Sequence, residues 1–257
     1  MDNTTYIALS RQQSLWNQLE VVANNLANAN TTGFKGSDTL FSQYIFKEPS
    51  DDRPFKDKVA FTHDFGLVRN LTQGTFNYTG NTFDLALQGE GYFVLQQPSN
   101  GANQATPEQR FTRAGAFTIN NEGQLVTQAG QLVMSTDNQP IVIPANNTGD
   151  ITIQGDGAVK TRDDKAVGKI RVVRFENERD LKAVDGTSFR SDNETPIEVP
   201  SPKVAQGVLE DSNVNSITEV TKLINVNRAY ADVAKLVDEE HKRKQQAADI
   251  FTRQVSA

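Results

Sequence analysis

The side chains best suited to catalysis or metal binding are few in this chain, and they are scattered. The two histidines, His63 and His241, have no matched neighbour at the spacing of a metal-ligand set. His63 falls in a loop-like stretch and His241 in a run of charged residues, so we interpret both as surface residues. The chain has no cysteine, which excludes disulfides, iron–sulfur clusters and thiol chemistry.

Adjacent carboxylates are the next candidates, because a pair of acids can divide the acid and base roles of a reaction. Asp51 with Asp52 and Asp163 with Asp164 are such pairs, but both lie in turn-like sequence, where carboxylates are usually solvated. A secreted enzyme that degrades the cell wall would need paired acids in a cleft, and it would have to use Asp163 and Asp164.

Two glycine-rich triplets superficially resemble phosphate-binding loops. They lie at residues 89–91 (GEG) and 155–157 (GDG). Neither opens a helix after a parallel strand, and no Gly-Lys-Ser/Thr follows, so hairpin turns are the better interpretation. We therefore predict no catalytic residue, no metal site and no cofactor, in a protein that is not an enzyme.

Composition narrows the classes of protein to which the chain could belong. The chain has 257 residues, enough for one large or two modest domains with a real core. Its net charge of -6 argues against a nucleic-acid partner, since phosphate binding requires a basic face. No apolar run is long enough to insert into a membrane, and the N-terminus lacks the pattern of a cleaved secretory signal peptide.

The N-terminal segment predicts an amphipathic helix over about residues 4–29. Its apolar residues follow a 4-3-4-3 spacing, which aligns them along one stripe: Leu15, Leu19, Val22, Leu26 and Ala29. A polar turn over residues 30–33 ends the helix, with Gly33 able to take a positive φ.

Asparagine crowds the end of this helix, at Asn24, Asn25, Asn28 and Asn30. Between Asp2 and Lys35 the only charged residues are Arg11 and Glu20. Neutral amides can be buried against other protein when each finds a hydrogen-bonding partner, whereas unpaired charges cannot. We infer a helix that packs on several sides, against other chains.

The middle of the chain changes pattern twice. Residues 36–75 lack a clear period and predict a long connecting loop with some anchoring aromatic residues. From residue 76 a period of two takes over, with turn residues between short strands. The expected strands are 83–87, 92–95, 116–119, 124–127, 132–134, 141–143, 151–153, 169–175, 181–184 and 188–190.

The C-terminal segment predicts a second long helix, to about Arg253. Ser216 and Glu219 have the spacing of a capping box, with Ser216 as the N-cap. Two apolar rows follow at heptad spacing. The first row is Ile217, Val220, Ile224, Ala231 and Ala234, and the second is Leu223, Val226, Tyr230, Val233 and Val237. One row suffices for the N-terminal helix, so the other requires a further partner.

These elements define an α+β fold. A mostly-β, antiparallel central domain is flanked by long N- and C-terminal helices that pair as a coiled coil. The expected divisions are a terminal helical domain of residues 1–35 and 212–257, a connecting region of residues 36–75 and a β-rich outer domain of residues 76–211.

Four blocks, in order along the chain, resemble the signatures of bacterial flagellar rod and hook proteins. The first is residues 22–35 (VANNLANANTTGFK), and the second is residues 83–93 (FDLALQGEGYF). The third combines FTRAGAF at residues 111–117 with NEGQLV at 121–126, and the fourth combines QGVLEDSNVN at 206–215 with NRAY at 227–230.

The resemblance implies a structural subunit of the flagellar basal body, in the rod that crosses the periplasm. The length and the opening residues are most similar to the proximal-rod members, and the distal-rod members are the alternative. It implies export through the flagellar type III apparatus without a cleaved signal peptide, and other rod subunits as partners. A β-domain binding module on a coiled-coil stalk is a further alternative.

In this interpretation, the terminal helices form an inner tube and the β-domain an outer layer. The predicted assembly residues are Leu15, Leu19, Val22, Asn24, Asn25, Leu26, Asn28, Asn30, Thr31, Thr32, Gly33, Phe34, Asn213, Asn215, Ile217, Val220, Ile224, Arg228, Tyr230, Val233 and Val237.

Overall fold

The computed structural model of the chain describes residues 2–47, 58–98, 108–144 and 151–255. The chain divides into two compact units. A helical unit comprises Met1–Ala27, Ser37–Arg69 and Asn215–Ala257, and a β unit comprises Asn28–Gly36 and Asn70–Val214. The expected combination of antiparallel β-structure with one helix near each end is confirmed for the described residues.

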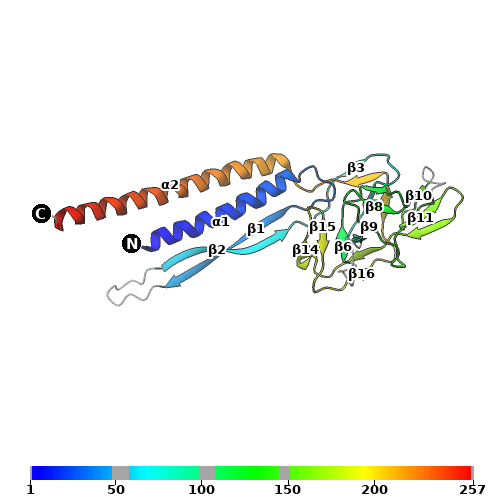
Figure 1. Cartoon of the computed structure of the whole chain (residues 1–257), viewed down its shortest axis with the longest axis horizontal. Coiled ribbons are helices and arrows are strands. Elements are labelled where there is room, and N and C mark those ends of the chain that lie inside the picture. Colours follow the sequence, from blue (N-terminus) through cyan, green and yellow to red (C-terminus); the bar gives the residue numbers. More distant parts are fainter. Residues whose placement is uncertain (1, 48–57, 99–107, 145–150, 256–257) are drawn as a thin grey trace. The chain divides into compact units, whose positions relative to one another are not determined.

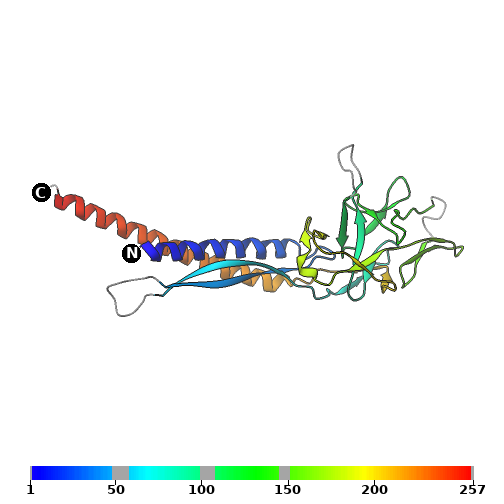
Figure 2. The ribbon, with the colours of Figure 1, turned by 90° about the horizontal axis from the view of Figure 1, so that it is seen from below.

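The helical unit has three layers. Helix α1 (Asp2–Ala27) contacts helix α2 (Ser216–Val255) on one side and strands β1 (Ser37–Lys47) and β2 (Lys58–Arg69) on another (Figures 1 and 2). The helices are antiparallel, because Thr5 lies beside Lys244 while Gln12 lies beside Tyr230. Neither described helix has a stretch apolar enough to cross a bilayer.

Strands β1 and β2 correct the expectation of a loop over residues 36–75. They form a long antiparallel hairpin, from Ser37 opposite Arg69 to Lys47 opposite Lys58. The register shifts where Leu40 pairs with Gly66 and Phe41 pairs with Asp64, so the extra residue of this bulge lies in β2. In β1 the apolar residues occur in runs, at residues 40–41 and 44–46, and do not alternate along the sequence. The linker-like residues 48–54 lie outside the described residues.

The start of α2 also differs from the expectation. The side-chain oxygen of Asn215 accepts hydrogen bonds from the backbone N–H groups of Ile217, at 3.0 Å, and Thr218, at 3.1 Å. Asn215 is therefore the N-cap, one residue before the predicted Ser216, because its short side chain reaches two of the free N–H groups of the first turn. Glu219 does not complete a capping box with Ser216, since its carboxylate bonds elsewhere.

The β unit is built from short strands, and those of the described residues pair antiparallel. They are β3 (Phe76–Tyr78), β4 (Leu85–Leu87), β5 (Tyr92–Gln96), β6 (Gln109–Thr112), β7 (Phe117–Ile119), β8 (Leu125–Thr127), β9 (Leu132–Val133), β10 (Ile151–Ile153), β11 (Ala158–Thr161), β12 (Ala166–Lys169), β13 (Val172–Arg174), β14 (Lys182–Ala183), β15 (Ser188–Arg190), β16 (Ile197–Glu198), β17 (Val204–Gln206) and β18 (Val208–Glu210). A 3-10 turn, η2 (Glu178–Asp180), follows β13.

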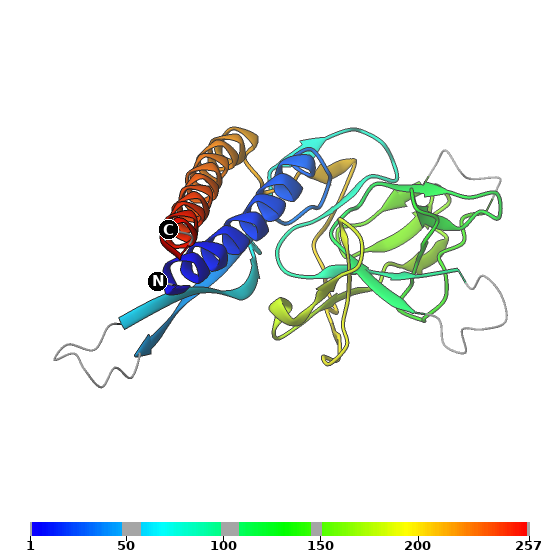
Figure 3. The same cartoon turned by 60° about the vertical axis from the view of Figure 1, so that its left-hand side comes forward.

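The largest sheet runs in the order β14-β15-β6-β5-β9-β8-β7, and β13 pairs with both β5 and β16. A three-stranded sheet, β10-β11-β12, and the pairs β17-β4 and β18-β3 complete the unit (Figure 3). Of the predicted strands, β10 and β15 have the expected bounds, whereas residues 141–143 contribute only the isolated bridge of Val142 with Gln124.

Strand β5 holds the core together because both of its faces are buried. Phe93 and Leu95 belong to one hydrophobic cluster, and Tyr92 and Val94 belong to another. Successive side chains of a strand point to opposite faces, so one strand supplies two cores. The β unit thereby buries its own apolar surface within a single chain.

The cap assignment predicts unequal effects for two neighbouring substitutions. Asn215→Ala should lower the free energy of unfolding of α2 by about 1 kcal/mol, because two N–H groups lose their acceptor. Ser216→Ala should change it little, since the side chain of Asn215 makes the cap bonds. Thermal unfolding followed by circular dichroism at the helical minimum measures both. A larger loss for Ser216→Ala would restore the capping-box assignment.

Candidate functional site

The polar turn that follows α1 belongs to the β unit, over Asn28–Gly36. The N–H of Thr31 donates to the carbonyl of Asn28 at 3.1 Å, and that of Phe34 donates to the carbonyl of Thr31 at 3.2 Å. The Thr31 hydroxyl also bonds the Asn28 side chain at 3.2 Å. Phe34 is buried, so the end of the turn is anchored in the unit.

Gly33 is required at the centre of this turn. Its φ is +70°, as the sequence predicts, and its N–H donates to the carbonyl of Glu210 at 2.7 Å. A Cβ on Gly33 would lie 2.3 Å from the backbone nitrogen of Ala114. Both the backbone conformation and the close approach of a second backbone segment exclude a larger residue.

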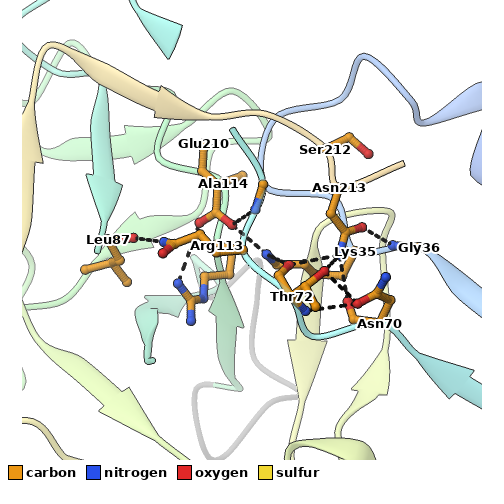
Figure 4. A network of polar contacts seen from close by, with 12 residues as sticks. Lys35, Gly36, Asn70, Thr72, Leu87, Arg113, Ala114, Glu210, Ser212 and Asn213 are labelled. Carbon is orange, nitrogen blue, oxygen red and sulfur yellow. Dashed lines mark hydrogen bonds and ion pairs between the residues drawn. The ribbon is translucent and has the colours of Figure 1, made fainter. Parts of the chain in front are cut away.

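Lys35 ends the turn inside the protein. Its side chain is 2% exposed, and its Nζ donates to Glu210 Oε1 at 2.5 Å and to the carbonyl of Thr72 at 2.8 Å (Figure 4). The other oxygen of Glu210 lies 3.6 Å from Arg113 Nη1, and both of these side chains are buried. One carboxylate therefore lies between two cations, and we call Lys35, Glu210 and Arg113 the buried triad.

Two further contacts fix the triad in place. The backbone N–H of Gly74 donates to Glu210 Oε1 at 3.1 Å, and the guanidinium of Arg113 lies over the ring of Tyr92, 5.3 Å from its centroid. Burial lowers the pKa of the Lys35 ammonium, and the hydrogen bond to Glu210 opposes that shift. The carboxylate of Glu210 thus offsets the desolvation of a cation that could not be buried alone.

Asn213 joins the same segments through its side-chain amide. Its oxygen accepts from the N–H of Gly36 at 2.9 Å, and its Nδ2 donates to the carbonyls of Asn70 and Thr72, each at 2.9 Å (Figure 4). The triad and Asn213 together bind the turn, residues 70–74 and the end of β18 into one cluster.

In the helical unit, the second apolar row of α2 is the row that meets α1. Val226 and Val233 form a buried cluster with Ala8 and Leu15, and Tyr230 packs beside it. The Tyr230 hydroxyl accepts from Gln12 Nε2 at 3.1 Å. The first row faces away from this cluster: Ile217 is 79% exposed.

The predicted assembly residues thus separate by exposure. Buried within the chain are Leu15, Val22, Asn25, Gly33, Phe34 and Val233, and half-buried are Leu19, Leu26, Asn28, Thr31, Thr32, Asn213, Tyr230 and Val237. Exposed are Asn24, Asn30, Asn215, Ile217, Val220, Ile224 and Arg228. A role of any of them between subunits stays a prediction.

The residues considered for catalysis do not form a site. His63 lies in β2 rather than in a loop, and His241 is an exposed residue of α2. Asp164 pairs with the nearby Lys160 at a turn, with a φ of +58°. Within the described ranges, no group of three or more metal-binding side chains is assembled.

The buried triad is not apparent from the pattern of residues along the chain. Lys35, Arg113 and Glu210 each lie in a different one of the blocks that carry the resemblance. Within residues 22–35, Lys35 is the only charged residue, and that isolation was the available signal. Arg113 and Glu210 are too far from Lys35 in the sequence for residue spacing to predict that they pair with it.

Three family models match the chain in order. The Flagella basal body rod protein model covers residues 6–35, and the model of the Flagellar hook protein FlgE/F/G D1 domain covers residues 86–161. The model of the Flagellar basal body rod FlgEFG protein C-terminal region covers residues 205–250.

Individual relatives match nearly end to end. A flagellar basal-body rod protein FlgF of Caulobacter vibrioides is 41% identical over 240 residues, which is 93% of either chain. A FlgF of Mesorhizobium japonicum is 29% identical over 92% of either chain. A FlgG of Caulobacter vibrioides is 35% identical over 85% of this chain and 88% of its own length.

The crowding at Gly33 predicts a difference between two glycines with similar backbones. Gly130 has a φ of +80°, and apart from Gly130 itself and its two chain neighbours no atom of the described residues lies within 4 Å of the point that its Cβ would occupy. Gly130→Ala should therefore cost only the backbone strain, about 1–2 kcal/mol. Gly33→Ala should cost more, because the added methyl group meets the Ala114 backbone. Urea unfolding monitored by hydrogen exchange in β5 compares them, and equal losses would contradict the close approach.

The triad predicts an order of stabilities. Glu210→Gln leaves two buried cations without a counter-charge and should lower the free energy of unfolding of the β unit by about 3–5 kcal/mol. Lys35→Met keeps Glu210 paired with Arg113, so its loss should be smaller. The exposed pair of Lys160 with Asp164 supplies the control Lys160→Met, which should change stability little. The same unfolding measurement applies, and a greater loss for Lys35→Met would refute this order.

Proposed function

The chain belongs to the family of flagellar basal-body rod proteins and is a structural subunit rather than an enzyme, and we propose that it joins the rod through its two terminal helices. The observation that carries the proposal is the first apolar row of α2. Ile217, Val220 and Ile224 are 79%, 41% and 46% exposed, on a helix whose other row is already packed. Apolar surface of this kind favours burial against another subunit.

Helix α1 offers a second apolar surface. Tyr6, Leu9 and Trp16 are 63%, 46% and 49% exposed. Helix α1 carries few charges, so little desolvation of charged groups would oppose its burial. We propose that the two helices pair as a coiled coil and that their outer surfaces contact neighbouring rod subunits.

The exposed polar residues near the end of α1 extend this surface. Asn24 and Asn30 are exposed, and Thr32 is half-buried. Amide and hydroxyl groups give directional hydrogen bonds, which suit a contact whose register must be fixed. We propose that the side chains of Asn30 and Thr32 bond to other subunits. The amide of Asn25 is engaged within the chain.

Similarity to the named relatives supports a proposal for the position of the chain within the rod. The relatives with the higher identities include both FlgF and FlgG, and the 41% match favours a FlgF-like, proximal position over a distal one. We propose that the partners are proximal and distal rod subunits and the type III export apparatus, and that the chain reaches the periplasmic rod without a cleaved signal peptide.

A charge on the exposed row of α2 tests the proposal. Ile224→Asp should block incorporation into the rod and abolish swimming, because a carboxylate would be buried in the contact. Asn225→Asp is the matched control: Asn225 is also exposed and is turned by about 100° around the helix. Each variant is expressed in the source bacterium from which the gene has been deleted. Motility is measured, together with the amount of the protein in isolated basal bodies.

Limited proteolysis of the purified variants checks that the β unit remains folded. Both variants should keep the same protease-resistant piece as the parent chain. If the Ile224→Asp strain builds normal rods, the proposed surface is wrong.

A further inference from the structure

The side chain of Asn25 occupies an unusual position for an amide near the end of a helix. It is 4% exposed, while its neighbour Asn24 is exposed. Its Oδ1 accepts from the N–H of Ser37 at 3.0 Å, and its Nδ2 donates to the carbonyl of the same residue at 2.8 Å. One side chain therefore satisfies both backbone groups of a single residue.

Ser37 is the first residue of β1 and pairs with Arg69 at the base of the hairpin. In an antiparallel ladder, a residue exchanges both its N–H and its C=O with one partner strand. The amide of Asn25 makes the same two-bond contact, so it acts in place of a neighbouring strand at the base of β1. This arrangement ties the end of α1 to the start of the hairpin.

The same amide reaches the first turns of α2. Asn25 Nδ2 lies 3.3 Å from Glu219 Oε2, and Glu219 is 5% exposed. Glu219 Oε1 pairs with Lys222 at 2.8 Å, and Lys222 Nζ pairs with Asp38 of β1 at 3.2 Å. The contacts close a ring through α1, β1 and α2.

We propose that Asn25 is the positioning residue of the helical unit, which sets the register of α1, α2 and the hairpin relative to one another. The buried members of the apolar cluster between the helices are the aliphatic side chains Ala8, Leu15, Val226 and Val233, whose contacts are not directional, whereas the hydrogen bonds of one amide are. The ring therefore determines which apolar residues the unit leaves exposed.

Asparagine is required because the position needs a donor and an acceptor at once. Aspartate has no N–H to donate, so the carbonyl of Ser37 would lose its partner, and a second carboxylate would face Glu219. The matched control is Asn24→Asp, which adds the same charge one residue earlier at an exposed position.

The direct test measures hydrogen exchange at the Ser37 amide in the full-length chain. Asn25→Asp should speed this exchange about tenfold or more, since the loss of a buried hydrogen-bonding partner opens the contact, and Asn24→Asp should leave it unchanged. Adding Glu219→Gln to Asn25→Asp should restore part of the protection, because the new amide can donate to the aspartate. Glu219→Gln alone completes the cycle.

Two results would overturn the proposal: equal exchange in Asn25→Asp and Asn24→Asp, or no recovery in the double variant relative to Asn25→Asp. The Asn25→Asp, Glu219→Gln and double variants are also scored for motility and rod incorporation, where the order of defects should match the order of exchange rates. The inference rests on the rod function only in this second readout. If the parent chain fails to restore motility to the deletion strain, the rod function fails, and the exchange measurement still decides the role of Asn25.

Discussion

A single carboxylate between two cations governs how the β unit is held together. Glu210 is buried, and the burial of Lys35 and Arg113 without its counter-charge would be strongly destabilising. The requirement fixes the end of the polar turn beside the end of β18, and this proximity in turn brings the turn so close to Ala114 that only glycine fits at position 33. A local choice of residue thus follows from a long-range electrostatic constraint.

The two units differ in how much of their apolar surface is buried within the chain. Strand β5 buries both faces, and its two clusters draw on most of the sheet. The helical unit buries only one row of α2 and leaves Ile217 and its neighbours in solvent. The β unit buries its apolar surface within the chain, whereas the helical unit leaves apolar side chains exposed. This difference accords with a structural subunit, because the helical unit can bury those side chains against neighbouring subunits.

Periodicity made much of this structure predictable, and its failures have physical causes. The two long helices, and the packing of one α2 row while the other stays exposed, follow from the spacing of apolar residues. The positive φ of Gly33 follows from a glycine at the end of a polar turn. The hairpin of β1 and β2 is not apparent from the sequence because the apolar residues of β1 occur in runs, at residues 40–41 and 44–46, and do not alternate. The cap was misplaced by one residue because Asn215 and Ser216 are both good caps. The triad could not be foreseen, since spacing carries no information about partners that folding brings together.

The distance between Lys35 and Glu210 along the chain has a consequence for timing. They are 175 residues apart, so the loop that their contact closes is among the longest the chain can form. Such contacts appear late in folding, after local turns and hairpins, because the closure entropy must be overcome first. During synthesis, Lys35 at the end of the turn cannot pair with Glu210 until β18 has been synthesised. Residues 22–35 therefore lack the contact between Lys35 and Glu210 during most of the synthesis of the chain. Their final structure depends on residues that are synthesised near the end.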